Sequence, residues 1–181
     1  MLTRIGLIAV AAVLALAGVV ALQPATYSVS RTAKISAAPA EIFALVNDFH
    51  KWDGWSPWAK LDPNMKTHYS GSPAGTGAVY HWESAQDDVG EGRMTITESV
   101  PDKQVLIRLE FIKPFASVAN TRFSMQPAAG ETSATTIEWT MSGENDFITK
   151  GFMLAMGGMD KAVGGDFEKG LAQMKALAEK K

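Results

Sequence analysis

Four successive segments of the chain alternate apolar and polar residues, and this pattern constrains the fold more than any other feature. The segments are residues 92–100, 104–111, 118–125 and 135–142. In the second of them Val105, Ile107, Leu109 and Phe111 fall on one side, with Arg108 on the other. Alternation with a period of two is typical of antiparallel strands that have one dry and one wet face. Three earlier stretches, residues 27–35, 65–70 and 79–83, predict further strands of the same sheet.

The second and third of these earlier stretches flank a loop rich in Gly, Ser and Pro at residues 71–77, which predicts a hairpin. One register places Lys66 opposite Glu83, and opposite charges across a strand pair favour that register. The same register pairs His68 with His81 and Tyr69 with Tyr80.

Only the carboxyl-terminal segment is long enough to cover the dry face of such a sheet. Within residues 159–180, apolar side chains recur every three or four positions, as in an amphipathic helix. They are Val163, Phe167, Leu171, Met174 and Leu177. The preceding residues 147–158 are apolar, rich in Met and bounded by glycines, which predicts either a mobile flap or a short packed helix.

Residues 5–22 contain no charge and no strong polar group, and they differ in kind from the rest of the chain. As a helix they would span about 27 Å, close to the thickness of a bilayer's hydrocarbon core. They predict a transmembrane anchor in residues 1–22, or a signal peptide that is cleaved. Either interpretation places a domain of residues 23–181 outside the cytoplasm, on a single-pass membrane protein or as a secreted or periplasmic protein.

The composition excludes several classes of function. There is no cysteine, so a disulfide framework, a Cys-ligated zinc and a thiol nucleophile are ruled out. Lys plus Arg is 17 and Asp plus Glu is 19, which gives a formal net charge of −2. This balance argues against binding nucleic acid by bulk charge.

Several local sequences resemble the START-like, or SRPBCC, superfamily, and most closely its bacterial polyketide cyclase/dehydrase-like branch. They are APAEIF at residues 38–43, WSPW at 55–58, GEGRMTI at 90–96 and GDFEKGL at 165–171. The resemblance covers roughly residues 27–180. It implies an α+β helix-grip fold, in which a curved antiparallel sheet wraps around a long carboxyl-terminal helix with a hydrophobic cavity between them.

We therefore predict that a small hydrophobic molecule or lipid binds in this cavity, without a cofactor or metal. The apolar set that would line it is also what a filled core would contain. The predicted ligand-binding residues are Tyr80, Trp82, Met94, Ile107, Leu109, Phe111, Phe123, Met125, Trp139, Met141, Phe152 and Met156. A cyclase-type enzyme acting in the same cavity and a protein-interaction module without a pocket are the alternatives.

Aromatic and ionisable residues outside this set have more than one interpretation each. Trp52, Trp55 and Trp58 lie in residues 48–58, an insert predicted to be a turn or a very short helix. They would line the mouth of a pocket, touch a bilayer interface, or hold this insert onto the sheet. His68 and His81, adjacent in the hairpin, would need a third ligand to hold a metal such as zinc.

Two further ionisable groups are candidates for acid–base chemistry. His50, near Asp48, is either a general base or a solvated loop residue. Glu98 shares parity with Met94 and Ile96, so it would point toward the dry face or reach solvent at the sheet edge.

Overall fold

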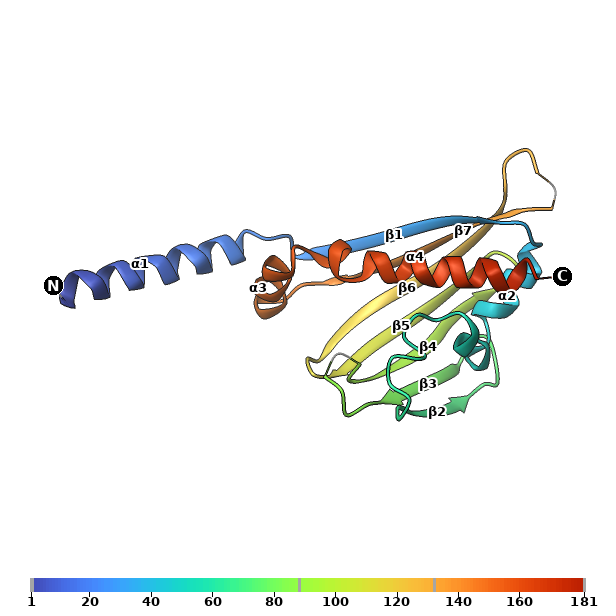
Figure 1. Ribbon diagram of the computed structural model, residues 1–181, viewed down its shortest axis with the longest axis horizontal. Coiled ribbons are helices and arrows are strands. Elements are labelled where there is room, and N and C mark those ends of the chain that lie inside the picture. Colours follow the sequence, from blue (N-terminus) through green and yellow to red (C-terminus); the bar gives the residue numbers. More distant parts are fainter. Residues whose placement is uncertain (1, 88, 132, 181) are drawn as a thin grey trace.

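A curved antiparallel sheet of seven strands grips one long helix along its concave face (Figure 1). The computed structural model describes residues 2–87, 89–131 and 133–180. The elements are α1 (Leu2–Ala21), β1 (Thr26–Ile35), α2 (Pro39–Val46), the 3-10 helix η1 (Phe49–Gly54), β2 (Lys66–Gly71), β3 (Ala78–Glu83), β4 (Glu91–Val100), β5 (Gln104–Lys113), β6 (Ser117–Pro127), β7 (Thr135–Glu144), α3 (Phe147–Met156) and α4 (Met159–Ala178). The predicted α+β fold with a curved sheet and a carboxyl-terminal helix is confirmed.

The strands lie in the order β1-β7-β6-β5-β4-β3-β2, and every neighbouring pair is antiparallel. In the β2–β3 hairpin, Lys66 pairs with Glu83, His68 with His81 and Tyr69 with Tyr80. The register predicted from the cross-strand charge pair is therefore the observed one.

Helix α2 closes one end of the sheet. Pro39 occupies its first turn, where the missing N–H costs nothing, and the Glu41 carboxylate accepts a hydrogen bond from the Ala38 N–H at 3.2 Å. Ile42 and Val46 are fully buried on its inner side. Asp48 is the N-cap of η1, and its carboxylate accepts a hydrogen bond from the His50 N–H at 3.0 Å.

Helix α4 runs along β1 on the concave face (Figure 1). Phe167, Leu171 and Met174 from the predicted stripe are buried, and Val163 and Leu177 are half-buried. The amphipathic pattern thus identified both the helix and the side that faces the sheet.

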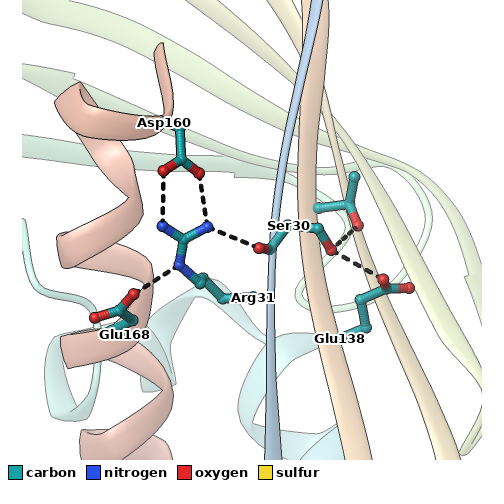
Figure 2. A network of polar contacts seen from close by, with 6 residues as sticks. Ser30, Arg31, Glu138, Asp160 and Glu168 are labelled. Carbon is teal, nitrogen blue, oxygen red and sulfur yellow. Dashed lines mark hydrogen bonds and ion pairs between the residues drawn. The ribbon is translucent and has the colours of Figure 1, made fainter. Parts of the chain in front are cut away.

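An ion-pair cluster fastens β1 to α4 (Figure 2). The Arg31 guanidinium contacts Asp160 through Nη1 at 2.7 Å and Nη2 at 3.1 Å, and its Nε donates to Glu168 at 2.7 Å. A Cβ at Gly164 would stand 2.2 Å from Arg31 Nη2, so only glycine lets the guanidinium lie this close to the helix. Hydrogen bonding to Arg31 lowers the pKa of Asp160, and its carboxylate raises the pKa of Arg31.

Helix α1 extends away from the domain (Figure 1), and most of its described side chains are exposed. The helix lies where the sequence predicts one. Among the residues that the structure describes, however, no helix is both long enough and apolar enough to cross a membrane. The prediction of a transmembrane helix is therefore not supported.

Residues 147–158, predicted as either a mobile flap or a short packed helix, contain the short helix α3. Asp146 begins it by accepting the Thr149 N–H at 2.7 Å, which lowers the pKa of that carboxyl group. Gly157 ends it with φ 83°, a left-handed conformation that favours glycine. No α3 side chain is buried, so this helix is not packed into the core.

Candidate functional site

The sheet brings the predicted strand residues together on its concave face. Tyr80, Met94 and Leu109 lie side by side on β3, β4 and β5. Further along the sheet, Phe123 of β6 lies beside Trp139 of β7. The alternation in the sequence therefore identified the side of the sheet that faces the helix.

Burial divides these predicted residues along the length of the strands. Seven are buried: Tyr80, Trp82, Ile107, Phe123, Met125, Trp139 and Met141. Three are half-buried, namely Met94, Leu109 and Phe111. The last two, Phe152 and Met156 on α3, are 49% and 46% exposed. The concave face is thus closed over most of its length and more open where β5 approaches its end at Lys113.

An aromatic cluster fills the space between β7 and the middle of α4. The rings of Trp139 and Phe167 stack with centroids 4.2 Å apart and planes only 5° from parallel. Trp55 and Trp58 meet Trp139 edge-on, with centroids 5.6 Å and 5.8 Å away. The absence of a side chain at Gly170 makes room for the indole of Trp139, because a Cβ at Gly170 would stand 2.8 Å from Trp139 Cζ3. Aromatic side chains therefore fill this part of the predicted cavity.

The three tryptophans of the insert serve mainly to hold it onto the sheet. Trp52 and Trp55 are buried, and their indole N–H groups donate to the carbonyls of Val46 and Leu45, each at 3.0 Å. Trp58 is half-buried and lies across Trp139 and Phe167. Of the alternatives predicted for these tryptophans, packing of the insert onto the sheet is the one observed for Trp52 and Trp55.

Polar groups on the concave face are few and buried. Burial raises the pKa of the Tyr80 hydroxyl, so this group stays protonated at neutral pH and can donate a hydrogen bond. Trp139 Nε1 is buried and finds no acceptor among the described residues. Thr121 is buried between Ile107 and Met141. Its parity with Phe123 in the sequence indicates this face, although the predicted lining did not include it.

The ionisable candidates lie outside this face. Glu98 does not continue the parity of Met94 and Ile96, because a β-bulge shifts the β4–β5 register between Ile96 and Glu98. Its side chain is exposed and accepts a hydrogen bond from Gln104 Nε2 at 2.6 Å. Of the two predictions for Glu98, the one in which its carboxylate reaches solvent is observed, and the inward orientation is not.

The histidines form no metal site in the described part of the chain, where no three His, Asp or Glu side chains are grouped to hold an ion. His68 pairs with His81 as predicted, and His81 Nε2 lies 3.4 Å from Glu91 Oε1. His50 Nδ1 lies 2.9 Å from Asp48 Oδ1, and its ring stacks on Tyr69 with centroids 4.1 Å apart. This exposed arrangement is that of a solvated loop histidine.

Two of the hollows on the described surface can be compared with the prediction, and none of the twelve predicted ligand-binding residues lines either of them. One, of about 380 Å³, has polar walls that include Asp62, Lys66 and Lys113. The other, of about 240 Å³, lies beside His50 and Tyr69.

The curved sheet and its gripped helix define the class of the domain, and the comparisons give its family. The chain belongs to the family described as "Polyketide cyclase / dehydrase and lipid transport", whose model matches residues 26–179. This confirms the resemblance seen in the sequence. No curated protein matches the chain.

Solved structures share the fold at low sequence identity. Protein CV1439 from Chromobacterium violaceum is 16% identical with a TM-score of 0.57, over 87% of this chain and 100% of that one. The hypothetical protein jhp0584 from Helicobacter pylori is 9% identical with a TM-score of 0.62, over 84% and 88%. The Aha1 protein from Colwellia psychrerythraea, solved as a dimer in solution, is 15% identical with a TM-score of 0.54, over 86% and 98%. At these identities the likeness concerns the fold alone.

Proposed function

We propose that this domain binds a hydrophobic small molecule or lipid on the open part of its concave face. The observation that carries the proposal is the change in burial along β4 and β5. Ile96 and Ile107 are each 1% exposed, whereas Met94, Leu109 and Phe111 further along the same strands are only half-buried. An apolar surface that the protein covers only partly gains free energy, about 25 cal/mol per Å², when a ligand removes it from water.

The chemistry of this surface favours binding over catalysis. Met side chains adapt to apolar ligands of varied shape, and aromatic rings add large contact areas. Trp82 and Phe111 meet edge-on at the more open end of the concave face, with ring centroids 6.2 Å apart. The lining is mainly apolar, while a cyclase-type enzyme needs polar groups to direct its reaction. The family description, which includes lipid transport, also supports a hydrophobic ligand.

The buried donors nearby suggest how such a ligand would be oriented. Tyr80 pairs with Met94 across β3 and β4, so its hydroxyl is the polar group that a ligand with one polar end would meet on this part of the face. We propose that the ligand's apolar chain lies over Leu109 and Phe111 with its polar end toward Tyr80. A location outside the cytoplasm, predicted from residues 1–22, remains part of the proposal.

A matched pair of variants on one strand tests the proposal. Leu109 faces the concave side of β5, and Leu106 faces the opposite side and is also half-buried. Binding of cis-parinaric acid, a fluorescent fatty acid, is titrated against the purified chain and both variants. Leu109→Asn should weaken binding about tenfold, because about 1.4 kcal/mol of apolar contact is lost. Leu106→Asn should leave binding unchanged.

Native mass spectrometry of gently purified protein supplies an independent readout. A co-purified lipid would support the proposal. Empty protein, together with equal affinities of the two variants, would favour the interaction module without a pocket. The stacked rings of Trp139 and Phe167, which fill part of the space beneath α4, fit that alternative as well.

A further inference from the structure

Exposed apolar side chains gather at one end of the domain, where the β5–β6 turn meets α3. Phe115 in the turn is 64% exposed, and on α3 Ile148 and Phe152 are 73% and 49% exposed. The rings of Phe115 and Phe152 have centroids 6.1 Å apart, so the turn and the helix form one surface. We call this surface, formed by Phe115, Phe147, Ile148 and Phe152, the apolar end. Contiguous exposed apolar surfaces of this kind mark sites of interaction.

Helix α1 leaves the domain beside the apolar end (Figure 1). Its Val20 side chain is buried and lies against Gly151 of α3. Lys150 Nζ lies 3.5 Å from the carbonyl oxygen of Ala21, at the end of α1. Four residues, 22–25, connect α1 to β1, so Ala21 and Thr26 cannot separate by more than about 18 Å. Because the end of α1 also contacts α3 through Val20 and Lys150, α1 and the apolar end lie in the same environment.

The exposed residues of α1 show what that environment is. Leu7, Ile8, Val10, Val13, Leu14 and Leu16 are each between 58% and 71% exposed. At about 100° per residue these positions are spread around the whole circumference of the helix rather than along one stripe. A protein groove covers one side of a helix, whereas the hydrocarbon of a lipid layer covers all sides.

The charge of the domain shows which force would hold it there. Removing residues 1–22, with Arg4 as their one charged residue, leaves 16 cations and 19 anions, or a net charge of −3. This balance argues against bulk attraction to anionic lipid as the main force and favours apolar transfer.

We propose that the apolar end docks into the surface of a lipid bilayer and that the exposed apolar residues of α1 contact the same lipid, which does not require α1 to cross the bilayer. Phe115, Ile148 and Phe152 then lie at the boundary between headgroups and acyl chains. The docking does not require that the domain bind a hydrophobic ligand, and its test below leaves the concave face untouched.

The absence of cysteine from the natural sequence permits a direct test. Single-cysteine variants of the full chain, Ile148→Cys in the apolar end and Lys103→Cys in the β4–β5 turn, carry a polarity-sensitive fluorophore. Lys103 is exposed and lies just before β5, at the strand end opposite the β5–β6 turn, so it serves as the matched control. Both are reconstituted with vesicles of phosphatidylcholine, with and without nitroxide-labelled lipid.

The proposal expects emission from position 148 to shift to shorter wavelength in vesicles. Nitroxide lipid should quench it several-fold more than emission from position 103, and raising the salt concentration should change neither result. Equal, weak quenching at both positions would overturn the proposal. Shielding of position 148 that depends on protein concentration and occurs without lipid would also overturn it, in favour of a second copy of the chain.

Discussion

Two glycines of α4 provide a matched test of how tightly the helix packs on the sheet. A Cβ at Gly170 would meet Trp139 Cζ3 at 2.8 Å and Pro57 Cδ at 3.1 Å, whereas a Cβ at Gly165 would meet nothing within 4 Å. Alanine is favoured over glycine by about 1 kcal/mol inside a helix, so Gly165→Ala should stabilise the protein by about that amount. Gly170→Ala gains the same term but overpacks the aromatic cluster, which costs about 1–3 kcal/mol.

The free energy of unfolding, measured by urea denaturation of the full chain in mild detergent, should therefore differ between the two variants by about 1–3 kcal/mol. Each kcal/mol corresponds to roughly 2–4 °C in Tm for a chain of this size. Replacing Trp139 by Phe removes the indole's benzo ring, so Gly170→Ala should become stabilising in a Trp139→Phe background. If Gly170→Ala is as stabilising as Gly165→Ala in the natural background, Trp139 does not pack against Gly170, and the filled space described here is wrong.

Two further predictions concern carboxylates that anchor helices. Asp160 has a pKa below its ordinary value of 3.8 because it accepts hydrogen bonds from Arg31, so its stabilising effect is present above that pH and is lost as the pH falls through the lowered value. Asp160→Asn should therefore be less stable than the natural protein at neutral pH, with a difference that shrinks in acid denaturation series below about pH 4; a constant difference would contradict the ion pair. Asp146→Ala should speed hydrogen exchange of the Thr149 amide, because that amide loses its acceptor. Asp146→Asn keeps an acceptor and should largely restore protection. Equal exchange in all three proteins would show that the cap does not stabilise α3.

Features with a strong period or a charge pair could be predicted from the sequence. Alternation located the strands from β4 to β7 and the side of the sheet that is buried, and the apolar stripe located α4. The charge pair of Lys66 and Glu83 predicted the β2–β3 register correctly. Register is strongly specified in such a sheet, because a slip of one residue would move every side chain of the strand to the other face.

Features that depend on tertiary contact could not be predicted this way. The bulge that turns Glu98 outward inserts one residue without any marker in the local sequence, so counting parity across it fails. The contacts of Arg31 join residues more than 100 positions apart, and nothing near Arg31 names its partners on α4. A signal was nevertheless present. Gly164 and Gly170 interrupt an otherwise good helix, and both are places where a large side chain from the sheet approaches the helix backbone.

The pairing of β1 with β7 has a mechanical consequence. Strand β1 is the next element after α1, and it pairs with β7 over its whole length, from Thr26 to Ile35. A pull along α1 would therefore load this ladder in shear, so that its hydrogen bonds resist together rather than opening one at a time. Because Arg31 ties the same strand to α4, the tension would pass into the central helix, and the domain could bear force at its amino-terminal tether without unravelling from that edge.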